Sequence, residues 1–379
     1  MSQKNVFPVA FSFFLFVGFC FAQDKTEMRR IDGVRHVLNP EKPWRGTVVL
    51  DVEKSLEINP FEQKDVAMRY VLFARDEDGG VILFDPNRAE GYKYDNKGRF
   101  LGSLVKKGEG PGEFSPMQMM KAFFVGNQIW VKGGQKLARF DREGRLLQEI
   151  KLKNRPSIIV DESHFISRRT TRNSQNELLE IHSLVKFGAE SLSDEVVVDI
   201  IQASNVTGIQ TKDGRGGFAE PWATPGLIVA YARKDKRILA ALNTKYEITV
   251  KNLKGETEFV IEKSHQKIRV NNKDKKDILG SDLMRFLSLY PDELLAFQDI
   301  QALPDGGLVV RRVSGVKKVE VDVFDADGRY LYALRPPEGI SFERAVFHGA
   351  GFSLIDYKED YPVYIDYRIR NLPDIFAKK

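Results

Sequence analysis

Hydrophobic and polar residues alternate over short stretches along most of the chain, and turns rich in Gly, Asp and Asn separate these stretches. Such alternation predicts strands with one buried face. Three of the turns share an aromatic residue followed by Asp-x-x-Gly-Arg. The Asp side chain can bond its own backbone, and Gly provides the positive φ that a tight turn needs. We therefore predict strand-turn-strand units around three turns: Asp95 to Gly98, Asp141 to Gly144, and Asp325 to Gly328.

Short apolar strands that follow a Gly or polar turn form a second recurring element. Six of them occur, at 79–85, 127–133, 163–169, 225–232, 305–312 and 349–357. They recur roughly every fifty residues, which is typical of the four-stranded blades of a β-propeller. The pattern predicts an all-β fold, a six-bladed β-propeller of four-stranded antiparallel blades, over residues 65–379. We assign the six apolar strands as the second strands of the blades.

The one convincing helical pattern covers residues 274–298. It falls in the longest gap between the six apolar strands, after the fourth of them. Pro291 lies inside it and should break it, because proline lacks a backbone N–H and clashes with the preceding turn. We predict a short helical insertion within the propeller and no domain boundary at this place.

The sixth unit reaches the end of the chain before a fourth strand has formed, since only "RNLPDIFAKK" follows the strand "YPVYIDYRI". The N-terminal leader, residues 23–64, contains an apolar and β-branched segment at 45–53, "RGTVVLDVE", that has no other assignment. We predict that this segment supplies the outer strand of the last blade and closes the ring. Closure would remove exposed strand edges that could pair with other chains.

Residues 1–22 have the features of a secretory signal peptide. Lys4 precedes an uninterrupted apolar run at 7–22, and Cys20 to Ala22 fits a cleavage site. Cleavage after Ala22 is expected, giving a secreted or periplasmic protein with no transmembrane segment. A lipid anchor on Cys20 and an uncleaved anchor are the alternatives. The mature chain would contain no cysteine, so its stability would depend on its core and not on disulfides.

Charged residues of both signs are interspersed along the chain, which has 58 basic and 53 acidic residues and a formal net charge of +5. This mixture does not form the basic surface that binds polyanions, so no nucleic-acid partner is expected. We expect a monomer whose partner is a protein, a peptide or a glycan.

Residues 106–147 resemble an NHL repeat. The matching positions are Gly108, Gly110, Gly112, Phe114, Pro116, Ile129, Trp130, Val131, Phe140, Asp141 and Gly144. The segment departs from that pattern at 132–135, "KGGQ", where the family has an Asp-Asn pair. The leader also resembles that of exported bacterial six-bladed propeller proteins. The resemblance implies an exported propeller with the binding or catalytic surface of that group at one face of the ring.

The glycine-rich loop "GEGPGEF", which begins at Gly108, allows three interpretations. It can be a hinge between blades, in which glycines make the turn and Phe114 packs between the blades. It can bind phosphate, but its glycine spacing matches no phosphate-binding fingerprint and two carboxylates lie within it. It can bind calcium through Glu109 and Glu113, since carboxylate oxygens are calcium ligands. We expect the hinge, with Gly108, Gly110 and Gly112 in structural roles, and no cofactor.

Three further residues are candidates for a binding surface. His164 and His348 precede second strands of two blades, near the predicted axis, and Trp222 lies in a Gly-rich loop. Turn or surface roles are the alternatives for the histidines. No catalytic residue is predicted. We expect a non-enzymatic binding module that acts through loops at one face of the ring; the alternative is a metal-dependent propeller hydrolase or lyase, similar to lactonases, with its site in the central channel.

Overall fold

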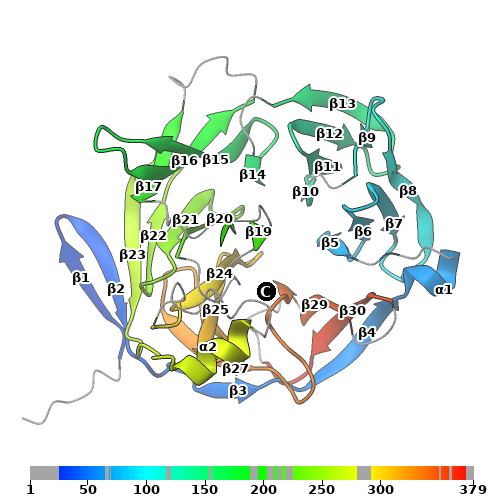
Figure 1. The fold of residues 1–379 in the computed structure, drawn as a ribbon. Coiled ribbons are helices and arrows are strands. Elements are labelled where there is room, and N and C mark those ends of the chain that lie inside the picture. Colours follow the sequence, from blue (N-terminus) through cyan, green and yellow to red (C-terminus); the bar gives the residue numbers. More distant parts are fainter. Residues whose placement is uncertain are drawn as a thin grey trace, which may run out of the picture.

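The computed structural model describes residues 25–64, 68, 70–116, 121–152, 156–187, 195–202, 209–210, 216–217, 225–279, 292–349, 351–357 and 361–372. The predicted signal peptide, its cleavage site and Trp222 lie outside these residues. Six sheets stand around a common axis (Figure 1). The prediction of an all-β, six-bladed propeller with four-stranded antiparallel blades is confirmed.

Each of the first three blades begins with its innermost strand and proceeds outward. Blade 1 consists of β5 (Leu72–Arg75), β6 (Val81–Asp85), β7 (Glu90–Tyr94) and β8 (Phe100–Lys107). Blade 2 consists of β10 (Lys121–Val125), β11 (Gln128–Gly133), β12 (Lys136–Phe140) and β13 (Leu146–Lys151). Blade 3 consists of β14 (Pro156–Ile159), β15 (His164–Arg172), β16 (Leu178–Lys186) and β17 (Val196–Gln202).

The other three blades follow the same order but receive strands from the N-terminal leader. Blade 4 consists of β20 (Leu227–Ala232), β21 (Arg237–Leu242), β22 (Glu247–Lys251) and β23 (Thr257–Lys263). Blade 5 consists of β24 (Phe297–Ala302), β25 (Leu308–Gly315), β26 (Lys318–Phe324) and β27 (Tyr330–Arg335). Blade 6 consists of β28 (Val346–His348), β29 (Gly351–Asp356), β30 (Val363–Ile369) and β4 (Val52–Ile58).

The leader runs along the outside of blades 4, 5 and 6 (Figure 1). Its hairpin of β1 (Glu27–Ile31) and β2 (Val34–Asn39) adds to blade 4 through parallel pairing of β2 with β23. Strand β3 (Thr47–Val49) pairs in parallel with β27 of blade 5, and β4 pairs antiparallel with β30. The outer position of blade 6 is therefore held by a leader strand, as predicted, but by residues 52–58, which share only Val52 and Glu53 with the predicted segment 45–53. The chain passes blades 4 and 5 before it reaches blade 6, so the segment at 47–49 pairs with blade 5.

Two other assignments differ from the sequence prediction. The apolar strand at 225–232 is the innermost strand of blade 4, and β21 is the second strand. Both strands are largely apolar in sequence, so the hydrophobic pattern alone does not distinguish them. The helix in the predicted insertion, α2, spans Asn272–Leu279, while residues 297–298 already belong to β24. Residues 280–291 lie outside the described part of the chain.

The remaining described elements are short. Strand β9 (Glu113–Phe114) pairs in parallel with the end of β8. Strands β18 (Ile209–Gln210) and β19 (Gly216–Gly217) pair antiparallel, and α1 (Pro60–Lys64) follows β4.

The three aromatic-Asp-x-x-Gly turns join the third and fourth strands of their blades. In each turn a carboxylate oxygen of the Asp accepts a backbone N–H from the residue four positions onward; Asp95, for example, accepts the N–H groups of Lys97 and Arg99, both at 2.9 Å. Asp141 accepts the backbone N–H of Arg145 in the same way, and Asp325 accepts that of Arg329. The glycines have φ of 76°, 91° and 85° at Gly98, Gly144 and Gly328 respectively, which is the left-handed region.

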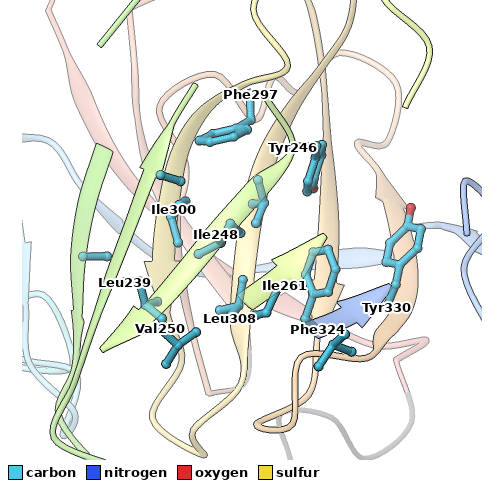
Figure 2. Packing of buried hydrophobic residues seen from close by; sticks show 14 of the residues in the cluster. Leu239, Tyr246, Ile248, Val250, Ile261, Phe297, Ile300, Leu308, Phe324 and Tyr330 are labelled. Atoms are coloured by element: carbon cyan, nitrogen blue, oxygen red, sulfur yellow. The ribbon is translucent and has the colours of Figure 1, made fainter. Parts of the chain in front are cut away.

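The hydrophobic core lies mainly between neighbouring blades. Figure 2 shows one cluster, in which side chains from the second to fourth strands of blade 4 face side chains of blade 5. Ile248 and Ile261 are fully buried there, as are Phe297 and Phe324. Alternate residues of each strand face the two sides of a blade, so each sheet contributes to two such clusters.

A buried ion cluster also joins blades 4 and 5. Asp322 has no exposed surface and accepts hydrogen bonds from the hydroxyls of Tyr246 and Tyr330, both at 2.7 Å. Lys263 Nζ lies 3.0 Å from one carboxylate oxygen and Arg312 Nε lies 3.1 Å from it. Burial alone would raise the pKa of Asp322, but the two cations outweigh it and lower that pKa.

Candidate functional site

The glycine-rich loop packs as a connection between blades 1 and 2. Gly112 has φ of 74°, and the aromatic ring of Phe114 is 99% buried in the cluster between the two blades. A Cβ on Gly112 would contact Phe140 and Leu146 at 3.3–3.5 Å. Because the backbone there is left-handed as well as crowded, a side chain at this position would be strained.

The two acidic residues of this loop are engaged within it. A carboxylate oxygen of Glu113 accepts the Gly110 N–H at 3.0 Å, and the carboxylate of Glu109 accepts a hydrogen bond from the hydroxyl of Ser115. Glu149 of β13 accepts the N–H of Gly112 at 2.8 Å. In the described part of the chain no group of three His, Cys, Asp or Glu side chains is arranged to hold a metal ion. These contacts support a structural role for the loop.

The two candidate histidines lie in different blades and do not form one site. His164 begins β15 of blade 3, where its ring nitrogen lies 3.1 Å from Asp161 across a turn. His348 ends β28 of blade 6, where Nε2 lies 2.7 Å from Asp366. Asp366 also accepts the Ser353 hydroxyl at 2.8 Å. Trp222 lies outside the described residues.

The structure instead shows a cavity at one end of the central channel, where the innermost strands of blades 1, 2, 5 and 6 begin. Its volume is about 550 Å³. The lining residues come from the starts of these strands and from the ends of second strands and adjoining loops: Tyr70, Val71, Leu72, Phe73, Phe84, Lys121, Ala122, Gln298, Arg311, Glu343, Arg344, Val346, Ile355 and Tyr357. We call this space the channel-mouth cavity. It has the size of sites that hold small molecules.

Two tyrosines line the channel-mouth cavity while remaining accessible. Tyr70 is 42% exposed and Tyr357 is 40% exposed. The hydroxyl of Tyr357 donates to the Val71 carbonyl at 2.9 Å and accepts the Val71 N–H at 3.3 Å. These bonds tie blade 6 to blade 1 and hold the Tyr357 ring in one orientation beside the cavity.

The cavity is more cationic than anionic in the described lining. Arg311 contacts Asp299 at 2.5 Å, and it also donates to the Glu343 carbonyl at 2.7 Å. Lys121 and Arg344 are exposed and have no carboxylate within ion-pair distance in the described structure. The side chain of Glu343 is the only carboxylate in that lining.

Sequence reasoning did not find the channel-mouth cavity. Its charged residues are spread from Lys121 to Arg344: Lys121 begins the apolar strand "KAFFV", Arg311 lies within β25, and Glu343 and Arg344 precede β28. The available signal was Lys121 at the start of an innermost strand and Glu343 and Arg344 just before another, because these strand starts gather at one end of the channel.

Comparisons with known proteins place the chain in a family. The family model designated DUF5128 and described as a 6-bladed beta-propeller matches residues 63–293, so the chain belongs to this family. No curated protein matches. The resemblance of residues 106–147 to an NHL repeat stays a prediction.

Several solved structures are similar in fold. A duf4221 family member from Bacteroides vulgatus has a TM-score of 0.52 at 10% identity, with coverage of 92% of this chain and 100% of that one. A Bacteroides fragilis protein assigned as exported has a TM-score of 0.48 at 12% identity, covering 89% and 99%. Virginiamycin B lyase from Staphylococcus aureus has a TM-score of 0.41 at 11% identity, covering 84% and 100%. The duf4221 family member, the one of these three with a TM-score above 0.5, shows a likeness of fold alone at 10% identity.

Of the helices in the described residues, neither has the length and apolar character that crossing a membrane requires.

Proposed function

We propose that this protein is an exported, non-enzymatic binding module whose ligand enters the channel-mouth cavity. The observation that supports this most is the cavity itself, about 550 Å³ in volume and lined by four of the six blades. Ligand sites are concave, mainly apolar and carry a few placed polar groups. This lining combines apolar strand residues with exposed tyrosines and cations.

The side chains that could coordinate a metal ion in the cavity favour a binding module over a metal-dependent hydrolase or lyase. Propeller enzymes of that kind would need several oxygen or nitrogen ligands around one metal ion. The described lining provides one carboxylate, that of Glu343, and no histidine. A metal site would have to recruit further groups, whereas a binding site needs only the surface that is present.

Filling the cavity tests the proposal. Val346 is 39% exposed and lines the cavity, so Val346→Trp would occupy part of it. Val197 is 45% exposed on β17 of blade 3, so Val197→Trp is a matched control. Wild type and both variants are screened for thermal stabilisation by a panel of sugars, organic acids and short peptides, since a ligand that binds the native state raises the melting temperature.

We expect that ligands which stabilise wild type also stabilise Val197→Trp but fail to stabilise Val346→Trp. Ligands that stabilise all three proteins equally would show binding elsewhere and overturn the proposal. Divalent-metal-dependent consumption of a lactone by the purified protein would favour the enzyme instead.

A further inference from the structure

The charges around the channel-mouth cavity do not balance. The ion pair between Arg311 and Asp299 is neutral as a unit. Of the other charged lining residues, Lys121 and Arg344 are cationic and Glu343 is anionic. The described lining therefore carries one excess positive charge. A partly enclosed cavity strengthens the effect of that charge, because low-dielectric walls focus the field.

Hydrogen-bond donors in the cavity wall add to this positive character. Gln298 Nε2 and Arg311 Nε are both enclosed and have no acceptor in the described structure. Both atoms are donors, and neither residue has an unpaired buried acceptor there. These two side chains therefore add unpaired donors and no unpaired buried acceptor to the wall, which favours an anion in the cavity over a cation.

The tyrosines supply the second half of the recognition surface. The Tyr357 ring is fixed by its two bonds to Val71, and the guanidinium of Arg344 lies 6.0 Å from the ring centroid. Tyr70 is exposed and lines the same cavity. A fixed aromatic surface binds a flat or cyclic group with little loss of conformational entropy. Cation and aromatic ring are therefore adjacent.

We propose that the channel-mouth cavity binds a small organic acid in which a carboxylate is attached to a ring, with Lys121 and Arg344 receiving the carboxylate and the tyrosines packing on the ring. This inference rests on the proposed function, since it names the ligand class of the same cavity. The volume of about 550 Å³ admits a ligand of one or two rings.

Matched pairs of probes test the ligand class. Glucuronate is compared with glucose, and benzoate with benzyl alcohol, by titration calorimetry; inorganic phosphate tests whether an oxyanion without a ring suffices. The double variant Lys121→Gln with Arg344→Gln removes the two cations. Lys106→Gln with Lys107→Gln is the control, because both lysines are exposed on β8.

We expect at least one of the two carboxylates to bind saturably with a dissociation constant of about 1 mM or lower, and its neutral partner to bind about tenfold more weakly. The cavity double variant should lose about tenfold in affinity for the carboxylate, and the β8 variant should retain it. Raising the ionic strength should weaken carboxylate binding in wild type, because partly exposed charges are screened by salt.

The experiment distinguishes an error in the proposed ligand class from an error in the proposed binding site. Equal binding of the neutral and acidic probes, lost in Val346→Trp, would overturn the ligand class and leave the cavity as the binding site. Carboxylate binding that survives in the double variant would place it elsewhere and overturn the inference. Tighter binding of phosphate than of both ring acids would show that the ring contributes nothing. If neither ring acid binds at about 10 mM, the inference is wrong whatever other ligand the cavity accepts.

Discussion

Replacing Asp322 with Asn should destabilise the propeller strongly, although the two side chains have nearly the same shape. Asp322 is fully buried and receives four donors, from Tyr246, Tyr330, Lys263 and Arg312. The amide would keep one acceptor and turn an N–H towards these donors. Arg312 retains the carboxylate of Glu320. Lys263, whose side chain is 2% exposed, loses the only carboxylate with which it forms an ion pair in the described structure.

The size of this loss of stability depends on whether Lys263 keeps its charge without a partner or releases its proton. Breaking a buried ion pair by removing one partner costs about 3–5 kcal/mol. Releasing the proton instead would cost about 5 kcal/mol at pH 7 for a lysine with an ordinary pKa. Burial already lowers the pKa of Lys263 in the wild type, so release costs less than that. We therefore expect a loss of about 3–4 kcal/mol at pH 7.

The pH dependence gives the decisive measurement. In the variant the folded-state pKa of Lys263 lies below its unfolded value, so the unfolded state binds more protons and stability rises with pH. Between the folded-state and unfolded-state pKa values of Lys263, each unit of pH increase restores up to about 1.4 kcal/mol of the variant's stability. Urea unfolding followed by circular dichroism at pH 7 and pH 9 should show the loss shrinking at the higher pH.

The control is Asp327→Asn, because the Asp327 side chain is 59% exposed and lies 4.0 Å from Arg329. This variant should stay within about 0.5 kcal/mol of wild type at both pH values. In wild type itself, the lowered pKa of Asp322 means that its stabilisation is present above the unfolded pKa of about 4 and is lost as the pH falls further. A loss below about 1 kcal/mol for Asp322→Asn at pH 7 would refute this account of the cluster.

Four further predictions concern the loop, the leader and the N-terminus. Phe114→Ala should cost about 3–5 kcal/mol in thermal or urea unfolding, since the ring is buried between two blades; an unchanged midpoint would contradict the hinge. Glu109→Gln with Glu113→Gln should leave the melting temperature unchanged with calcium or chelator, because an amide oxygen can accept the same hydrogen bonds; a calcium-induced rise in wild type that the double variant lacks would indicate a metal site. Deleting residues 25–58 should give aggregates in size-exclusion chromatography, because it exposes the strand edges of blades 4, 5 and 6; a monomer with the wild-type melting temperature would contradict this. Mass spectrometry of the exported protein should find Gln23 as the first residue, and retention of residues 1–22 would show the signal assignment to be wrong.

The blade architecture could be predicted from sequence because its signals are local. At Asp141 and Gly144, for example, one side chain bonds the backbone four residues onward and one glycine takes the positive φ, so the turn is specified within a few residues. The alternation in the flanking strands fixes which face is buried. The same alternation does not tell an innermost strand from a second strand, which is why residues 225–232 were assigned to the wrong position in blade 4.

The course of the leader and the channel-mouth cavity depend on long-range contacts. Thr47 pairs with Ala333, which lies far along the chain, and nothing in the local pattern of the leader selects that partner over the last blade. The cavity likewise joins Lys121 to Arg344 only because the ring closes. Lys121 and Arg344 look like ordinary surface residues in the sequence, and they line the same cavity only because four blades meet around it.

The leader and the cavity are connected through the same two blades. Arg311 lies on β25 of blade 5, and Arg344 and Tyr357 flank the first two strands of blade 6. On their outer edges these blades pair with β3 and β4 of the leader, while Tyr357 fastens blade 6 to Val71 of blade 1 on the inside. We therefore expect that loosening the outer strands would disturb the side of the cavity wall that blades 5 and 6 provide. If the proposed function holds, the leader supports the binding cavity as well as covering the edges of the ring.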